Sequence, residues 1–554
     1  MAETKPGTPR GEELPTNHLG RVRRCGGGSP PQRVYSPPMR VGAASGTAAT
    51  IAALVLAAGA VGHRERPTTF PDPSRGSVPA VRTGGPSIVV CKPDSEARIR
   101  RLPPPARSRA LALLPRCTEE HIQAAVDAAA NGTRILLLPG VYREEPSRRI
   151  PYPVPLCEPY EVPPADGPGT VPGYRYTLRC PNAQNLIAVV GDSDEDGVCD
   201  SKCNLQIEGM GARPADVLID GDRTKLNVIR ADRADGIVLR NFTVQYSDFN
   251  NVYVLETNGF RFDRVVSRWS REYGFLTFSV DHGLYENLVA YGNGDAAFYP
   301  GSSAEGGCKR YSVEIRDSEA YGNVLGVSGT GANSIWVHDS SFHGNTAGIV
   351  VDSVSPGHPG MPQDCARFER NRVYANNLDP YTAERDAYCA RPALERNPRV
   401  LCPSFPMAVG TGILILGGNR NVIRANRIYD NWRWGTALYW VPGFSRGDES
   451  PEAQLDTSHG NRYVGNVMGL RPDGRRAANG RDFFWDGQGS RNCWERNGRV
   501  SSVPARLDTC PGRAEAGPAR PEAFAELVAC IAWNPQTNPN PAGCSWLRRP
   551  PKPR

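Results

Sequence analysis

A repeat of about 22 residues constrains the fold of this 554-residue chain more than any other feature. From about residue 226 onward, an Asn or Asp follows a short β-type run at regular intervals. The first steps between these positions are 22, 24, 30 and 22 residues, and the later, longer steps contain insertions with Pro and Cys. The column consists of Asn241, Asp263, Asn287, Asp317, Asp339, Asn371, Asn426 and Asn466. Self-similarity at this period is typical of a solenoid.

Two further marks follow each member of this column. The second mark is an Asn five or six residues later, namely Asn293, Asn323, Asn345, Asn376 or Asn377, and Asn431. The third mark is a short strand that begins near Gly274, Ala296, Gly326, Gly348 and Gly412. One coil therefore holds three short strands joined by bends. Such strands are too short to be stable alone, so the coils must stack on one another.

The Asn/Asp column has a physical reason. A tight bend between strands requires a positive φ, which Asn and Asp tolerate better than other residues with a side chain. Stacked Asn amides can also hydrogen-bond from coil to coil. Leucine-rich repeats have a similar period, but their Leu-x-x-Leu-x-Leu pattern is missing. The remaining alternative is a set of loop asparagines in an ordinary β-sandwich. We predict an all-β parallel β-helix over residues 116–480.

The cysteines indicate an oxidised, exported protein. Of the 15 cysteines, Cys25 lies upstream of the only long apolar segment and the other 14 lie downstream. An even number beyond a targeting segment fits a disulfide framework, and the absence of any CxxC pair argues against zinc. Pairing of sequence neighbours is our hypothesis for the connectivity. It would join Cys91–Cys117, Cys157–Cys180, Cys199–Cys203, Cys308–Cys365, Cys389–Cys402, Cys493–Cys510 and Cys530–Cys544.

The flanking segments extend this interpretation. Residues 1–62 contain an uncharged stretch at about 41–62, preceded by arginines and ending near Ala58-Gly59-Ala60, which predicts a signal peptide. A retained single membrane anchor is the alternative, because 22 residues can span a bilayer. Either one predicts a secreted or cell-surface protein. Residues 63–115 are rich in Pro and Arg and predict a disordered linker. Residues 481–554, with four Cys and four Trp, predict a disulfide-rich C-terminal cap over the last coil.

The start of the ordered region resembles a known family. Thr118 is a candidate N-cap for an apolar-striped helix, which leads into a β-type run and Pro139-Gly140-Val141-Tyr142. Residues 122–127 with 135–142 look like the N-terminal cap helix of pectate-lyase-like β-helices. The coils from about 205 to 480 resemble right-handed parallel β-helix repeats. The chain is most similar to secreted actinobacterial β-helix repeat proteins, many without an assigned activity. The resemblance implies a right-handed coil and a substrate lying along the third-mark strands.

Alternation along the third-mark strands indicates which side chains point outward. The outward set includes Tyr253, Phe278, Phe298 and Tyr439, with Asp352 as its only acid. Aromatic side chains suit stacking on sugar rings, so we expect these four to bind a polysaccharide or cell-wall glycan. In the alternative interpretation, an insertion of the chain simply covers this apolar strip.

Asp352 is the main candidate catalytic residue, because burial among apolar neighbours would raise its pKa. Asp281 and His282 follow a strand and are further candidates, although such pairs are more often structural. Asp364 could supply the second carboxyl group that inverting glycoside hydrolysis needs. The complete catalytic sets of polygalacturonases, pectate lyases and alginate epimerases are absent; Asp295, for example, stands alone where polygalacturonases carry a pair of acids.

A metal loop is predicted at residues 192–200. Asp192, Asp194, Asp196 and Asp200 occupy positions 1, 3, 5 and 9 of a pattern with Gly197 at position 6. This matches the start of a structural calcium loop, and it resembles thrombospondin type 3 repeats. Position 12 is Cys203 instead of Glu. The alternative is a solvated acidic loop held by nearby cysteines.

Composition and charge narrow the functional classes. The net charge of +7 comes from basic residues dispersed among acidic ones, which argues against a nucleic-acid partner. We expect a monomer that acts on or binds polysaccharide, as a hydrolase, lyase or epimerase. The alternative is a non-catalytic surface β-helix that binds glycan or is structural.

Overall fold

The computed structural model describes residues 64–144, 154–514 and 520–554. The chain divides into two units, Met1–Ala48 and Ala49–Arg554, and every described residue belongs to the second. The predicted signal or anchor segment and Cys25 lie outside the described residues. Within the described part, no helix has the length and apolarity that a membrane crossing requires.

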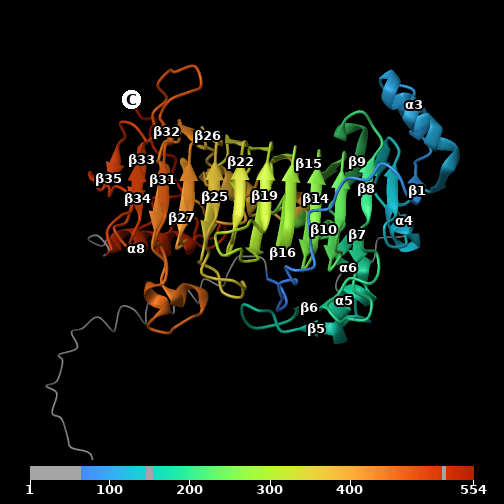
Figure 1. Ribbon diagram of the computed structural model, residues 1–554, viewed down its shortest axis with the longest axis horizontal. Helices are drawn as coiled ribbons and strands as arrows, with labels where there is room; N and C mark the ends of the chain where they lie inside the picture. The colour runs from blue at the N-terminus through green and yellow to red at the C-terminus, as the bar shows by residue number, and fades with distance from the viewer. Residues whose placement is uncertain (1–63, 145–153, 515–519) are drawn as a thin grey trace, which may run out of the picture. The chain divides into compact units, whose positions relative to one another are not determined.

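The second unit is a parallel β-helix (Figure 1), which confirms the predicted fold. Each coil contributes one strand to each of three parallel sheets, here called sheets 1, 2 and 3. Sheet 1 contains β7 (Asn185–Val190), β10 (Asn227–Asp232), β13 (Asn250–Leu255), the first half of β16 (Phe275–Glu286), β18 (Ala296–Ser303), β21 (Leu325–Val327), β24 (Ala347–Asp352), β27 (Thr411–Leu416), β30 (Trp434–Tyr439), β33 (Arg481–Trp485) and β35 (Ser502–Val503).

Sheet 2 follows sheet 1 along each coil. It contains β1 (Ser87–Val90), β2 (Cys117–Glu119), β3 (Arg134–Leu137), β8 (Gln206–Gly209), β11 (Ile237–Arg240), β14 (Asn258–Asp263), the second half of β16, β19 (Val313–Arg316), β22 (Ile335–His338), β25 (Arg367–Glu369), β28 (Val422–Arg424), β31 (Arg462–Val464) and β34 (Cys493–Glu495).

Sheet 3 closes each coil. It contains β4 (Gly140–Tyr142), β9 (Val217–Asp220), β12 (Thr243–Gln245), β15 (Val266–Arg268), β17 (Val289–Tyr291), β20 (Glu319–Tyr321), β23 (Ser341–His343), β26 (Arg372–Tyr374), β29 (Arg427–Tyr429) and β32 (Val467–Met468).

The remaining elements are short and decorate the coils. They are the antiparallel pair β5 (Glu161–Val162) and β6 (Val171–Pro172), the helices α2 (Ser95–Ile99), α3 (Pro104–Leu113), α4 (Ile122–Ala128), α5 (Tyr174–Arg179), α6 (Pro181–Gln184), α7 (Ala383–Cys389) and α8 (Pro521–Ile531), and the 3-10 turns η1 (Leu114–Arg116), η2 (Glu158–Tyr160), η3 (Pro214–Asp216), η4 (Ala393–Glu395), η5 (Gly443–Arg446) and η6 (Ala453–Leu455).

The interior of the coils is one continuous apolar core. In sheet 1, side chains stack in register from strand to strand through Ile229, Val252, Phe275, Phe298 and Val327. The column continues through Ile349 and Ile413. All of these side chains are fully buried. Stacking each coil on the next thus buries apolar surface that a single coil would expose.

Asparagine ladders connect the coils as predicted. Asn293, Asn323, Asn345, Asn376, Asn431 and Asn479 form one ladder, in which each amide donates to the next amide oxygen at 2.8–3.2 Å. Asn371, Asn426, Asn466 and Asn497 form another. These buried amides bond neighbouring coils and leave few unsatisfied groups in the bends.

The bend prediction holds for half of the first column. Asn241, Asn287, Asp317 and Asp339 have positive φ, between 49° and 56°. In the coil of Asp263 the following residue, Arg264, takes the positive φ, and in the last three coils the preceding residue does: Arg370, Ala425 and Gly465. In these last three coils, the Asn side chain hydrogen-bonds along the ladder, and the residue before it adopts the positive φ.

The segment before residue 116 corrects the prediction of a disordered linker. Among residues 64–115, β1 pairs in parallel with β2 and β3. Helices α2 and α3 bury Ile99, Ala106 and Ala110 against Leu136 of the first coil. The apolar run of β1 was hidden within a segment whose average composition is rich in Pro and Arg. The coils therefore begin earlier than the predicted boundary.

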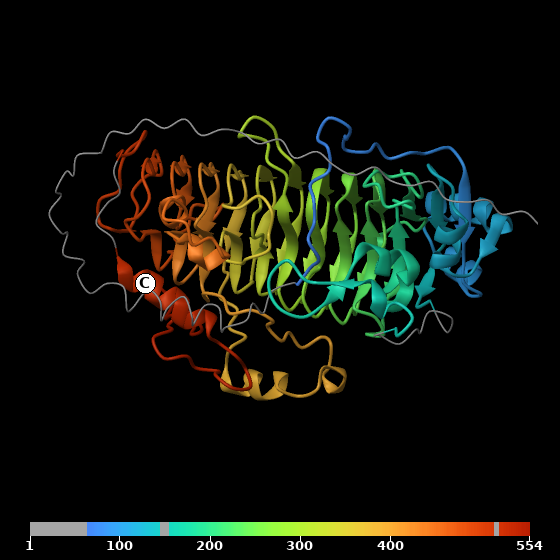
Figure 2. The ribbon, with the colours of Figure 1, turned by 90° about the horizontal axis from the view of Figure 1, so that it is seen from below.

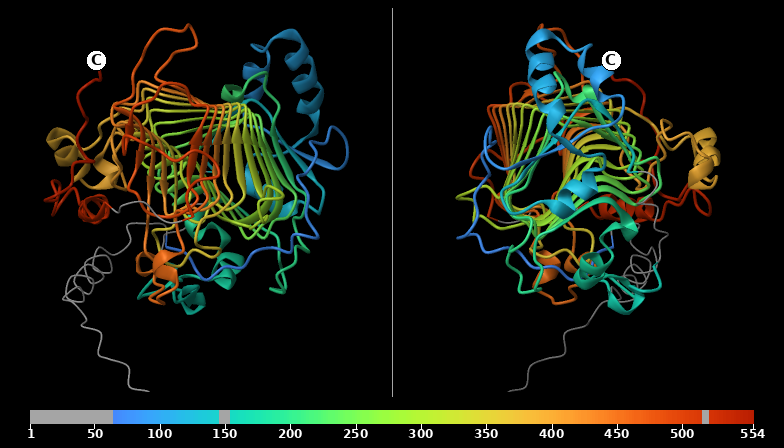
Figure 3. Two further views of the ribbon diagram at one scale, coloured as in Figure 1. Left: turned by 60° about the vertical axis from the view of Figure 1, so that its left-hand side comes forward. Right: turned by 90° about the vertical axis from the view of Figure 1, so that its right-hand side faces the viewer.

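The N-terminal cap helix is confirmed as α4. Its residues Ile122, Ala125 and Val126 join the apolar core, and Figure 3 shows the coils end-on with the blue N-terminal region in front. Thr118 is not the N-cap, because it lies in β2. Instead, the carboxylate of Glu144 accepts hydrogen bonds from the backbone N–H groups of Ile122 (2.7 Å) and Gln123 (3.2 Å). A carboxylate in the first turn also suits the helix dipole.

The C-terminal region has two parts. Strands β33, β34 and β35 extend the coils beyond residue 480, and Trp494, Val500 and Leu507 pack against the end of the core. Cys493–Cys510 fixes this cap. Residues 520–554, with α8, lie along sheet 1 and not over the last coil. All seven predicted disulfides are present with the predicted pairing.

Candidate functional site

The outward face of sheet 1 is aromatic, as alternation predicts, but the chain itself covers it. Tyr253, Phe278 and Tyr439 are each only 1% exposed. They belong to an apolar cluster that lies outside the coils and includes residues of α8 and Trp546. Figure 2 shows α7 (gold) and the C-terminal segment (red) together on one side of the coils. This face therefore agrees with the alternative interpretation, in which other parts of the chain cover the apolar strip. The rings of Tyr253, Phe278 and Tyr439 offer no open surface to a polymer.

Phe298 does not belong to this face, which corrects the prediction. Its ring lies inside the coils, 5.8 Å from the ring of Phe275, with which it pairs across the sheet. Tyr299 is the outward residue in this strand and pairs with Leu276. The alternation was counted one residue out of register in β18, and a shift of one residue exchanges the inner and outer sides of a strand.

Near the N-terminal end of sheet 1, a buried network of charges seals the face. The guanidinium of Arg66 contacts Asp232 at 3.0 Å and Glu256 at 2.6 Å, and all three side chains are at most 4% exposed. The hydroxyl of Tyr253 donates a hydrogen bond to Glu65. The guanidinium of Arg230 lies 4.8 Å from the centre of the Tyr253 ring. Because each buried charge has an opposite partner, the segment that carries Glu65 and Arg66 is held firmly on the sheet.

Further along the same face, a cavity lies between the sheet and its cover. It contains about 710 Å³ of space free of protein atoms, part of it open to solvent. Asp295, just before β18, and Asp352, at the end of β24, both line it, as does Tyr299 of β18. The cover consists mainly of apolar side chains from residues 405–407, α8 and Trp546.

Asp352 lies where the sequence places it, pointing outward from β24. Its carboxylate accepts hydrogen bonds from the hydroxyl of Thr330 (2.8 Å) and the backbone N–H of Val354 (3.0 Å). Burial raises the pKa of Asp352, while these two hydrogen bonds favour its ionised form. The catalytic role of Asp352 stays a prediction.

Asp295 is the second carboxyl group of the cavity. It is 6% exposed and accepts a hydrogen bond from the hydroxyl of Ser404 at 3.3 Å. Burial raises the pKa of Asp295 to about 7, and the negative charge of Asp352 acts in the same direction. In the sequence, Asp295 stands alone where a related motif carries a pair of acids. Its partner Asp352 belongs to a coil two turns away, so no local spacing joins them.

Tyr299 and His358 also line the cavity and contact each other. The Tyr299 hydroxyl lies 3.3 Å from Nε2 of His358, which belongs to the loop after β24. The Nδ1 atom of His358 lies 3.1 Å from the carbonyl oxygen of Pro356, and its ring lies 5.1 Å from that of Phe278. With Tyr273, which hydrogen-bonds Asp295, the cavity is lined by two acids, two phenols and an imidazole, a set that can donate and accept protons.

The other predicted catalytic residues lie elsewhere in structural contacts. Asp281 is buried and makes two hydrogen bonds to the guanidinium of Arg310, at 2.7 and 2.6 Å. His282 bonds through Nδ1 to Oδ1 of Asn258 at 2.9 Å. Asp364 pairs with Arg420. None of Asp281, His282 and Asp364 lines the cavity.

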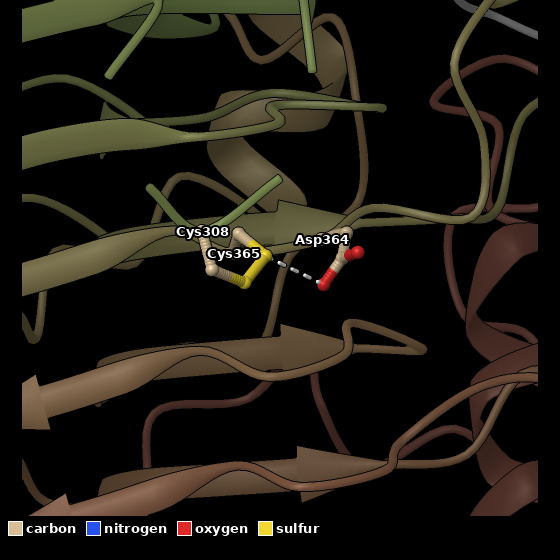
Figure 4. A group of neighbouring side chains, drawn as sticks. All are labelled: Cys308, Asp364 and Cys365. Atoms are coloured by element: carbon tan, nitrogen blue, oxygen red, sulfur yellow. Dashed lines mark hydrogen bonds between the residues drawn. A yellow bond between two sulfur atoms is a disulfide. The ribbon is translucent and has the colours of Figure 1, made fainter. Parts of the chain in front are cut away.

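Asp364 lies beside the Cys308–Cys365 disulfide, with its carboxylate 3.1 Å from Sγ of Cys365 (Figure 4). Asp364 with these two sulfur atoms has the spacing of a metal site. Because both sulfur atoms are bonded to each other, they are not thiolates and cannot bind a metal as such.

The predicted calcium loop brings three of its four aspartates together. One oxygen each of Asp192, Asp194 and Asp196 lies within 4.8 Å of the others. Asp192 accepts hydrogen bonds from the backbone N–H of Gly197 (2.9 Å) and from the guanidinium of Arg233 (2.7 Å). Asp200 turns away and bonds to Ser193. Arg233 thus already bonds the carboxylate of Asp192, which is buried. Of these three aspartates, Asp194 and Asp196 are the two that are exposed and could bind a metal ion.

Comparison with known proteins gives a fold-level likeness only. No family model matches this chain, and no curated protein does. Among solved structures, it is similar to pectate lyase Pel9A, with 12% identity, 78% of this chain and 80% of that chain covered, and a TM-score of 0.30. It is also similar to the A-module of mannuronan C-5 epimerase AlgE6 from Azotobacter vinelandii, with 14% identity, 70% and 95% coverage and a TM-score of 0.30. A rhamnogalacturonan lyase matches with 10% identity, 75% and 89% coverage and a TM-score of 0.31. Values of this size say nothing about which reaction, if any, this chain performs.

Proposed function

We propose that this is an exported protein that acts on a glycan, and that the cavity on sheet 1 is its active site. One observation carries the proposal: Asp295 and Asp352 line the same cavity, and burial raises the pKa of both. Two carboxyl groups held in different protonation states are the machinery of most glycoside hydrolases.

The environments of the two carboxyl groups suggest their roles. With a pKa of about 7, Asp295 keeps its proton at mildly acidic pH and acts as the general acid that protonates the leaving oxygen. Asp352 accepts a backbone N–H and a hydroxyl, both of which favour the carboxylate, so it acts as base or nucleophile. Tyr299 lines the same cavity and can orient the substrate by hydrogen bonding.

The covered strip restricts the substrate. Because Tyr253, Phe278 and Tyr439 are buried, a polymer cannot lie along sheet 1 across them. We therefore propose that the cavity takes a chain end or a short oligosaccharide. The seven disulfides support an extracytoplasmic location, since such bonds persist in oxidising compartments.

The test is a screen of neutral and uronate oligosaccharides, followed both by new reducing ends and by the ultraviolet absorbance of unsaturated products. On the substrate so found, Asp295→Asn and Asp352→Asn should each lower kcat by about 100-fold or more, as expected for an acid or base. Asp317→Asn is the matched control, because Asp317 is exposed and its φ of 49° suits Asn. Full activity in both cavity variants would exclude this active site.

A non-catalytic glycan-binding or structural role is the second candidate. The apolar cover over the cavity favours it, because a permanently closed cover would exclude substrate. Glycan binding without turnover across the panel, unchanged by Asp352→Asn, is the outcome that this candidate predicts.

Calcium binding by the loop at residues 192–200 is a separate proposal. The close approach of Asp194 and Asp196 supports it, and the contact of Arg233 with Asp192 weakens it. Calorimetric titration with calcium should show uptake that Asp194→Asn abolishes and Asp473→Asn, in an exposed loop, leaves unchanged. Equal titrations of the wild type and Asp194→Asn would reject the site.

A further inference from the structure

A second pocket lies on another side of the coils and is lined by arginine. It is formed by the bends between sheets 3 and 1 in consecutive coils and by the segment 393–402, which returns from a later insertion. It holds about 420 Å³ of space free of protein atoms, part of it open to solvent. Arg223, Arg271 and Arg396 line it, together with Ser247 and Trp269.

The returning segment is fixed in place, so the pocket is a built feature and not a gap under a loose loop. Arg223 donates hydrogen bonds to the carbonyl oxygens of Arg396 (2.9 Å) and Ala393. The Cys389–Cys402 disulfide closes the base of the insertion, and Ser404 N–H donates to the carbonyl of Gly294 at 3.0 Å. These bonds hold three arginines near one another despite their mutual repulsion.

The charges around the pocket do not balance. No acidic residue is among those that line it. Asp248 lies nearby and approaches Arg271 at 3.7 Å and Arg223 at 4.0 Å. The pKa of the neighbouring Glu272 is raised to about 8 by burial and by the charge of Asp295, so this carboxyl is largely uncharged at neutral pH. Three arginines therefore share one nearby acid, Asp248, which contacts two of them.

Two buried donors at the pocket also lack partners. Nε of Arg396 and the hydroxyl of Ser247 make no hydrogen bond to any described residue, although both atoms are shielded from solvent. Burial and the positive charges of Arg271 and Arg223 lower the pKa of Arg396. Oδ1 of the nearby Asp248 also lacks a hydrogen bond and pairs with neither donor. Leaving such donors unsatisfied is costly, so the two donors at this pocket point to a further acceptor.

We propose that this pocket binds the oxyanion of a phosphate or sulfate ester. Guanidinium groups bind such oxyanions through paired N–H donors, and the Ser247 hydroxyl supplies a further donor. An excess of two positive charges is matched by a phosphate monoester, which carries about −1.5 to −2 near pH 7, better than by a single carboxylate. The site goes beyond the proposed function, because it shares no lining residue with the cavity that holds Asp295 and Asp352.

The test uses the full exported chain and isothermal calorimetry. The probes are inorganic phosphate, inorganic sulfate, glucose 6-phosphate, glucose 6-sulfate and glucuronate. Both glucose esters should bind, with an affinity that decreases as salt increases. Arg271→Gln and Arg396→Gln should each weaken binding by about tenfold, the equivalent of one charge-assisted hydrogen bond. Arg475→Gln, on an exposed loop, is the control and should leave binding unchanged.

The outcomes separate the possibilities. Stronger binding of the phosphate than of the sulfate ester would identify a phosphate site, and the reverse a sulfate site. Glucuronate binding as tightly as either ester would overturn the assignment to an ester. Absence of binding by every probe, or binding that both arginine variants retain in full, would overturn the site itself. Unchanged thermal unfolding of Arg271→Gln, whose side chain is half exposed, ensures that a loss of binding is not a loss of fold.

Discussion

Sheets 1 and 3 both carry outward-facing aromatic residues, but the two sheets shelter them differently. On sheet 3, the rings of Tyr291, Tyr321, His343, Tyr374 and Tyr429 form a ladder with centroid distances of 4.7–5.5 Å and interplanar angles of at most 12°. Most of these side chains are half-buried. On sheet 1, the aromatic side chains are covered by segments that return from distant parts of the chain.

The difference shows two ways in which a β-helix can accommodate exposed aromatic side chains. On sheet 3, consecutive coils place a ring at the same position, so each ring covers the faces of its neighbours. On sheet 1, the residues at one register position vary between acidic, aliphatic and aromatic, as in Asp352, Leu416 and Tyr439. Side chains on such a surface do not stack on one another, and other segments of the chain cover them. This cover leaves a cavity at Asp295 and Asp352.

The largest effect should come from breaking the cover of sheet 1. Trp546 is 2% exposed, and its ring packs edge-on against Tyr439 (5.6 Å) and Trp434 (6.0 Å). Trp546→Ala should lower the free energy of unfolding by about 3–5 kcal/mol, because it leaves a large void in a packed cluster. Urea unfolding measures this loss.

A matched control is Leu394→Ala, because Leu394 is 74% exposed and lies outside the cover. It should change the free energy of unfolding by less than about 0.5 kcal/mol. A small effect of Trp546→Ala would show that the C-terminal segment does not hold the cover of sheet 1 in solution.

Features that repeat along the chain could be predicted from the sequence, and features formed by distant segments could not. Period, ladder and disulfide pairing are local or periodic properties, so the coils and Asn293, Asn323 and Asn345 were found from spacing alone. The strand β1 was missed because its single apolar run lies within a Pro-rich segment and pairs with a strand that comes later in the chain. Periodicity cannot reveal a strand outside the repeat.

The candidate site was harder to predict for a related reason. Outward residues such as Tyr253 and Asp352 follow from alternation, whereas their burial depends on Arg66 and Trp546, which are distant in sequence. A register error of one residue in β18 exchanged Phe298 for Tyr299. Asp281 and His282 were favoured as an Asp-His pair, yet Arg310, which neutralises Asp281, lies in another coil.

The second-largest effect concerns how a buried acid under the cover and an exposed acid change the stability of the protein with pH. Asp295 has a pKa of about 7 in the folded protein, above that of the unfolded chain. The folded state thus keeps a proton that the unfolded state has lost, and stability decreases as the pH rises through this range. From pH 5 to pH 7, the stability of the wild type relative to Asp295→Asn should decrease by about 2 kcal/mol.

Asp339 provides the opposite case at the exposed corner between sheets 2 and 3. Its contact with Arg370 lowers the pKa of Asp339 to about 2. Its contribution to stability is complete above the unfolded pKa and is lost as the pH falls toward 2. Asp339 itself stays ionised between pH 5 and pH 7, so any change of Asp339→Asn relative to the wild type in this range should come from His338, whose pKa Asp339 raises. If the stability difference between the wild type and Asp295→Asn stays constant from pH 5 to pH 7, water reaches Asp295 freely.

The smallest effect tests whether the ladder of sheet 3 covers itself. The rings of Tyr291 and Tyr321 are stacked at 5.0 Å with an interplanar angle of 8°. A double-mutant cycle with Tyr291→Ala and Tyr321→Ala should give a coupling free energy of about 1 kcal/mol in urea unfolding, as stacked aromatic pairs do. Tyr291 and Tyr374 belong to coils that are not adjacent, so the same cycle on that pair should give no coupling. Equal coupling in the two pairs would mean that the rings respond to the stability of the coils as a whole, and the ladder would then contribute no cover of its own.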